Sequence, residues 1–141
     1  MDNSIEFPVI AISKNDSFEV ITDWDDLCGC SWPAFKNGYY EDLSLYDSSG
    51  VMWQVLSVKP LSKPSLFSRL FNSTMNVDIS IGKAVENAKD MALKYIFDLI
   101  DNDPDDLYCQ FVTHEELKDK MRLSETPSDL IEIAQTMGGA S

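Results

Sequence analysis

Short apolar runs and alternating apolar–polar runs predict β-strands in the first half of the chain. Two pairs of these runs are joined by turn residues, a pattern that indicates β-hairpins. The second pair is the clearer one, because the short glycine-containing turn Ser48–Gly50 separates two β-rich runs. The predicted strands are Phe7–Ser13, Phe18–Ile21, Tyr39–Asp47, Val51–Val58 and Asn76–Ile81.

Helical periodicity is strongest over Gly82–Ile100, where apolar residues recur at three- and four-residue intervals and form one stripe. Capping patterns indicate further helix starts. Thr113 and Glu116 form a capping box, and Pro127 occupies the first helical position of the last helix. The shorter predicted helices are Thr22–Leu27 with Thr22 as N-cap, Ser65–Phe71, Thr113–Leu123, and one from Thr126 to about Met137.

This order, with strands first and helices later, is typical of an α+β fold. We therefore expect an antiparallel sheet of about four to five strands, with one long amphipathic helix packed on one face and short C-terminal helices. Residues 1–137 are expected to form a single domain, and residues 138–141 a flexible tail.

Charge is concentrated rather than spread along the chain. There are 24 acidic residues against 11 Lys and Arg, a net charge of -13. The segment from Asn15 to Asp47 contains eight acidic residues and one basic residue, and so does the segment from Asp98 to Asp119. The intervening segment Lys59–Lys94 contains six basic and three acidic residues. Such a field repels nucleic acid and anionic membranes and attracts basic proteins. We expect a basic protein partner, with neither nucleic acid nor membrane as a ligand.

The expected location is the cytoplasm. The N-terminal residues lack the basic and apolar pattern of a secretion signal, and no run of about 18 apolar residues occurs. The three cysteines are an odd number and cannot all pair within one chain. Reduced thiols are typical of the cytosol.

Motifs for metal or catalytic chemistry are incomplete. A calcium loop counted from Asp101 needs Gly at position 6 and Glu at position 12, where Asp106 and Val112 stand. Zinc binding by Cys28, Cys30, Cys109 and His114, and a nucleophilic Cys28 or Cys30 assisted by His114, remain open. Glycine-rich phosphate loops and nucleophile elbows are absent from the sequence. We expect no catalytic residue, bound metal or cofactor.

Aromatic residues interleaved with acids are the best candidates for a functional surface. Tyr and Trp are favoured anchors of protein interfaces, and complementary charge speeds the encounter with a basic partner. The alternative is that Trp24 belongs to the core and its acidic neighbours form a solvated face. The candidate partner-binding residues are Asp23, Trp24, Asp25, Asp26, Tyr40, Glu41, Asp42, Asp47, Asp101, Asp103, Asp105 and Asp106.

In size, acidity, α+β pattern and lack of a catalytic motif, the chain resembles the small immunity proteins of bacterial polymorphic toxin and contact-dependent inhibition systems. The segments that carry the resemblance are Asp23–Asp26, Tyr39–Asp47 and Asp98–Asp106. It implies a non-catalytic protein that occludes a cognate toxin, often a basic nuclease. The alternatives are an intracellular adaptor or regulator, for which a homodimer through the Tyr39–Val58 hairpin is one form, and an enzyme that uses Cys28 or Cys30.

Overall fold

The structure, a computed structural model, describes residues 5–13, 18–31, 38–60, 74–102 and 113–136. The fold is α+β, as expected. Its strands are β1 (Val9–Ser13), β2 (Phe18–Ile21), β3 (Gly29–Ser31), β4 (Leu43–Tyr46), β5 (Met52–Pro60) and β6 (Thr74–Val85). Its helices are α1 (Trp24–Cys28), α4 (Lys89–Asp101), α5 (His114–Arg122) and α6 (Pro127–Thr136).

All the paired strands run antiparallel and form one sheet in the order β2-β1-β4-β5-β6-β3. Five of these strands, β2, β1, β4, β5 and β6, make up an antiparallel sheet of the expected size, and the short β3 extends it by a sixth strand at the β6 edge. β3 pairs with the start of β6 and was not among the predicted strands. β4 and β5 are interior strands, bonded to neighbours on both sides. Pairing with β4 covers β5 over Met52–Gln54, whereas the rest of β5 pairs with β6 alone among the described strands.

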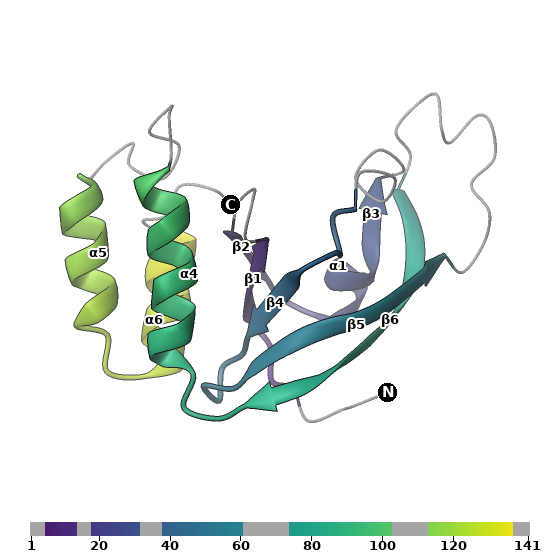
Figure 1. Ribbon diagram of the computed structural model, residues 1–141, viewed down its shortest axis with the longest axis horizontal. Coiled ribbons are helices and arrows are strands. Elements are labelled where there is room, and N and C mark those ends of the chain that lie inside the picture. Colours follow the sequence, from purple (N-terminus) through teal and green to yellow (C-terminus); the bar gives the residue numbers. More distant parts are fainter. Residues whose placement is uncertain (1–4, 14–17, 32–37, 61–73, 103–112, 137–141) are drawn as a thin grey trace.

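Strand alternation builds a separate apolar core on each face of the sheet. In β1, Ile10 and Ile12 enter the core beneath α4, α5 and α6, which we call the helix-side core. Val9 and Ala11 enter the opposite core together with Leu27 of α1. The helices α4–α6 lie at one end of the molecule, whereas α1 lies in the other half, next to β3 (Figure 1). Central strands are therefore covered on both faces, which explains why β1 and β4 are almost entirely apolar.

The prediction of one long helix over Gly82–Ile100 is not confirmed. α4 begins at Lys89 and has 13 residues, while α5 and α6 have 9 and 10. The preceding residues continue β6 as far as Val85, and Lys83 and Asn87 have φ angles of 53° and 52°. A positive φ is incompatible with an α-helix, so the helical spacing of the apolar residues before Lys89 was coincidental.

Two further boundaries differ from the prediction. The predicted strand Tyr39–Asp47 is extended only over β4, because the residues before it form a turn with Glu41 N bonded to Gly38 O at 2.9 Å. α1 is capped by Asp23, not Thr22, since the Asp23 carboxylate accepts the Asp26 N–H at 2.7 Å.

The predicted Thr113 cap of α5 is confirmed, because the Glu116 N–H donates to the Thr113 hydroxyl at 3.1 Å. Ser65–Phe71 and the tail 138–141 lie outside the described residues.

Within the part of the chain that the structure describes, no helix is both long and apolar enough to cross a membrane.

Candidate protein-binding surface

The short helix α1 presents carboxylates to solvent. Asp23 caps the helix, and Asp25 and Asp26 occupy its first turn, where the positive end of the helix dipole favours acids. All three side chains are exposed. Trp24 is only half-buried, and its ring packs edge-on against Phe7 with centroids 5.4 Å apart. α1 thus exposes charge while Trp24 and Leu27 attach it to the core opposite α4–α6.

The turn at residues 38–42 lies against α1. The Tyr40 hydroxyl donates to the carbonyl of Leu27 at 2.7 Å, and its ring packs edge-on against Tyr39 at 4.9 Å. The Tyr39 hydroxyl donates to Glu19 of β2 at 2.5 Å. The Tyr40 bond holds the turn that carries the exposed Glu41 and Asp42 against α1. We call this set the α1 acidic surface: Asp23, Trp24, Asp25, Asp26, Glu41 and Asp42.

The described part of the chain leaves negative charge on this surface without a paired cation. Among the described residues, no Lys or Arg forms an ion pair with Asp25, Glu41 or Asp42. Burial, the bond to Glu19 and the nearby negative charges, including Asp26, all raise the pKa of Tyr39. The Tyr39 hydroxyl therefore stays protonated and keeps its donor. The surface as a whole is suited to bind cations of a partner.

Tyr40 and Asp47, both expected to bind a partner, are buried instead. Tyr40 is 2% exposed and serves as a packing residue between the turn and α1. The Asp47 carboxylate is fully buried and accepts bonds from Ser49, Val51, Trp53 and the backbone of Glu6. Burial would raise the pKa of Asp47, but these donors outweigh it and the pKa is lowered. Asp47 is therefore an ionised structural group, not a surface acid.

The second acidic segment is on the opposite side of the sheet from α1. Asp101 ends α4 and pairs with Lys118, whose side chain is buried between α4 and α5. Lys118 also lies 3.8 Å from Glu115, so part of this acidity is neutralised internally. Asp103, Asp105 and Asp106 lie outside the described residues. The described parts of the two acidic segments therefore do not form one face (Figure 1).

The structure does not bring Cys28 and His114 together. Cys28 ends α1 and packs against the core on that face, whereas His114 begins α5 in the layer on the other face. Burial, followed by the charges of Asp78 and Asp25, raises the pKa of the Cys28 thiol, which weakens it as a nucleophile. Among the described residues, no group of three or more His, Cys, Asp or Glu side chains could hold a metal ion. Cys109 and the Cys30 side chain lie outside this description.

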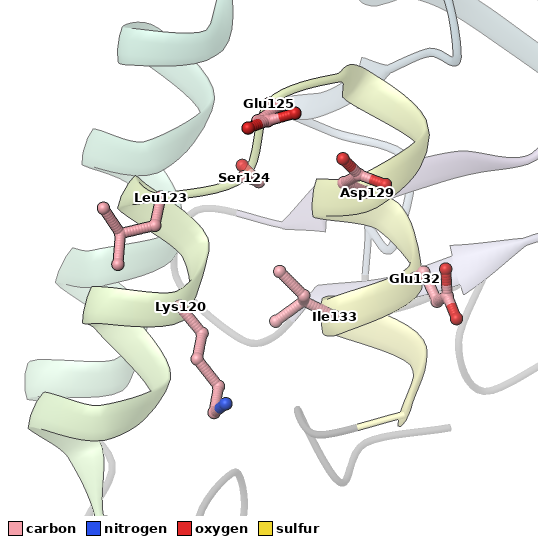
Figure 2. Close-up of a pocket in the computed structure, with 7 residues that line it drawn as sticks. All are labelled: Lys120, Leu123, Ser124, Glu125, Asp129, Glu132 and Ile133. Carbon is pink, nitrogen blue, oxygen red and sulfur yellow. The ribbon is translucent and has the colours of Figure 1, made fainter.

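Sequence reasoning missed two features. Glu19, which fixes Tyr39, stands alone in β2 and carries no local signal for this role. A groove between α5 and α6 was also missed, although the exposed Leu123 falls off the apolar stripe of α5. Figure 2 shows the residues that line this groove.

Comparison with known proteins gives no relative: no family model matches the chain, and no curated protein or solved structure matches it significantly.

Proposed function

We propose that this chain is a non-catalytic binding protein that neutralises a basic protein partner. The most plausible role is that of an immunity protein acting in the cytoplasm against a cognate bacterial toxin. The observation that carries the proposal is the α1 acidic surface. Its carboxylates come from two segments, α1 and the 38–42 turn, and Asp25, Glu41 and Asp42 lack a cationic partner among the described residues.

The mechanism would be stoichiometric occlusion. A nuclease holds phosphates with Lys and Arg, and an array of carboxylates can pair with the same groups. The long-range field of a chain with a net charge of -13 would speed the encounter. Trp24, which is half-buried and stands between Asp23 and Asp25 in the sequence, would supply apolar contact area once the partner has docked.

The test uses the protein encoded in the neighbouring reading frame, which should be a basic toxin if the proposal is right. Co-expression should rescue growth from its toxicity, and the purified proteins should form a complex. The association rate should fall roughly tenfold or more between low and high salt, since salt screens charge steering. Asp25→Lys together with Glu41→Lys should slow association and abolish rescue. The matched control, Asp90→Lys with Asp98→Lys on α4, changes net charge equally on the other face of the sheet.

Several outcomes would count against the proposal. Equal loss of rescue in both double variants would show that net charge alone matters, not the α1 acidic surface. An association rate indifferent to salt would refute electrostatic docking. A neighbouring basic protein that neither harms cells nor binds this chain would refute the immunity role itself.

A further inference from the structure

Two adjacent tyrosines tie the turn at residues 38–42 to two different elements of the fold. The Tyr39 hydroxyl donates to the Glu19 carboxylate of β2 at 2.5 Å, and the Tyr40 hydroxyl donates to the carbonyl of Leu27 in α1 at 2.7 Å. The two tyrosine rings pack edge-on, with centroids 4.9 Å apart. The place of the acids that this turn contributes to the α1 acidic surface therefore depends on these contacts.

The backbone of the turn is not fixed by its own sequence alone. The Glu41 N–H donates to the Gly38 carbonyl at 2.9 Å, but Gly38 and Asp42 have φ angles of 80° and 57°. A positive φ is disfavoured for a residue with a side chain, although Asp tolerates it better than most. Such conformations persist where the surrounding structure holds them. The turn needs contacts from outside itself, and Tyr39 and Tyr40 supply them.

β2 is a firm anchor for Tyr39. Glu19 pairs with Ala11 of β1, which faces the core that lies against α1. The sequence neighbours of Glu19, Phe18 and Val20, pack into the helix-side core on the other face of the sheet. A hydroxyl that donates to a carboxylate at this distance makes a charge-assisted bond, which is stronger than a bond between neutral groups. Tyr39 is thus bonded to a strand that is itself held on both faces.

The turn lies close enough to α1 for their charges to interact. Burial and then Glu19 raise the pKa of Tyr39 most, and the charge of Asp26 in the first turn of α1 adds to them. Carboxylates of like charge repel one another at short range. Without a tie, repulsion would favour conformations in which the exposed Glu41 and Asp42 move away from α1.

We propose that Glu19 and Tyr39 are positioning residues for the α1 acidic surface. Their hydrogen bond fixes the turn in the free protein, so that Glu41 and Asp42 lie against α1 before a cationic partner arrives. A surface that is already ordered loses less conformational entropy on binding, which strengthens the complex. Both residues act through the turn rather than by contact with the partner. This inference rests on the proposed function, because it takes the α1 acidic surface as the site that binds cations.

The first measurement is made on the free protein. Amide hydrogen exchange at Glu41 and Leu43, whose N–H groups bond within the turn, should be at least about fivefold faster in Tyr39→Phe than in the wild type. Tyr39→Phe removes the hydroxyl and keeps the ring that packs on Tyr40. The control, Ser124→Ala, removes a buried hydroxyl bond in the helix layer and should leave exchange at these two amides unchanged. Unchanged exchange in Tyr39→Phe would overturn the proposal.

The second measurement links the turn to binding. Pentaarginine serves as a purely cationic probe and is titrated into the isotope-labelled protein at low salt, where charge is little screened. The amide shifts of Asp25 and Glu41 give its dissociation constant. Tyr39→Phe should raise this constant about threefold, because the turn must now be ordered on binding. Ser124→Ala should not change it. Tyr39→Phe leaves the net charge of the protein unchanged, so weaker attraction does not account for the loss.

Two variants of Glu19 with equal charge separate the hydrogen bond from the charge. Glu19→Gln and Glu19→Ala each remove one negative charge, but the Gln carbonyl still accepts the Tyr39 hydroxyl. Glu19→Ala should therefore bind pentaarginine about twofold more weakly than Glu19→Gln, since a neutral bond is weaker than a charge-assisted one. In a Tyr39→Phe background the two variants should bind equally, because the bond is already absent.

Three results would overturn the positioning role: equal binding by Glu19→Gln and Glu19→Ala, wild-type binding by Tyr39→Phe, or no shift at Asp25 and Glu41 of the wild type at millimolar pentaarginine. Failure of the proposed immunity function has a different signature. The protein of the neighbouring reading frame would then not bind the wild type, while the differences among the Tyr39 and Glu19 variants would remain.

Discussion

The indole N–H of Trp53 in β5 donates a 2.9 Å hydrogen bond to the carboxylate of Asp47, the residue that follows β4. The other oxygen of this buried carboxylate accepts the backbone N–H of Ser49 at 2.9 Å and that of Val51 at 3.0 Å. Asp47 therefore closes the β4–β5 turn and attaches it to Trp53, which lies in the core beneath α1. A single carboxylate organises the hairpin at the centre of the sheet.

Asp47→Asn should destabilise the protein strongly. The amide replaces one acceptor oxygen with a donor that faces other donors, and the negative charge that strengthens the remaining bonds is lost. The expected loss is roughly 2–4 kcal/mol in the free energy of unfolding, because a bond to a charged group contributes about 1.5–3 kcal/mol. Urea denaturation measures this change. Asp42→Asn, at an exposed turn position with a φ of 57° that Asn tolerates, should change stability little. Equal effects in the two variants would contradict the role of Asp47.

Asp47 should also make stability depend on pH in the acidic range. The pKa of Asp47 in the folded state lies below the usual value of 3.8. At a pH between the folded-state pKa and 3.8, the folded state therefore binds fewer protons than the unfolded state. The stabilisation is therefore present above pH 3.8 and is lost as pH falls through the folded pKa. The stability gap between the wild type and Asp47→Asn should narrow as the pH falls below 3.8. Urea denaturation of both proteins over a pH series tests this, and a constant gap would contradict it.

The β4–β5 hairpin was predictable, but the role of Asp47 was not. Alternation and the Ser48–Gly50 turn are local signals, and they placed the hairpin correctly. The donors of Asp47 include Trp53 in the next strand and Glu6, which is 41 residues away in sequence. Since tertiary structure brings these groups together, sequence pattern alone made Asp47 appear to be a surface acid.

The placement of the two acidic segments was likewise beyond local sequence reasoning. Asp25 and Asp101 lie on opposite faces because α1 packs against β6 on one face, whereas α4 belongs to the helix layer whose α6 packs against β1 and β2 on the other. Charge density along the chain contains no information about strand order. By contrast, the Thr113 cap and Pro127 at the start of α6 were correctly predicted, since capping depends on residues within a few positions.

Gly50→Ala should destabilise the protein more than Gly82→Ala. Gly50 has a φ of 86°, and an added Cβ would lie 3.2 Å from Pro127 of α6, so the expected cost is about 1–2 kcal/mol. At Gly82 the added Cβ would meet only the half-exposed Leu56 side chain, which can rotate away. The expected change there is within about 0.5 kcal/mol. Thermal unfolding of both variants gives the comparison, and a larger loss at Gly82 would contradict this account.

Cys28 should react slowly with iodoacetamide at neutral pH, because burial and then the charges of Asp78 and Asp25 raise the pKa of its thiol. Asp78→Asn should speed the reaction a few-fold by removing one of these charges. Peptide mass spectrometry with fragmentation resolves Cys28 from Cys30 and Cys109. Asp129→Asn, on the opposite face of the sheet, serves as the control and should leave the rate unchanged. Fast alkylation of the wild type at neutral pH would contradict the raised pKa.

Lys89→Met should loosen the connection between α5 and α6. Lys89 stands in the first turn of α4, where the helix dipole disfavours a cation, yet its ammonium bridges the carbonyls of Arg122 and Ser124 at the end of α5. Loss of both bonds, partly offset by relief at the dipole, should cost about 1 kcal/mol. Hydrogen exchange at Leu123 and Ser124 should speed up more than at Ile10, because the effect is local. Lys94→Met, at an exposed position of the same helix, should change neither stability nor exchange. Matching behaviour of the two variants would show that the Lys89 bridge does not hold this turn.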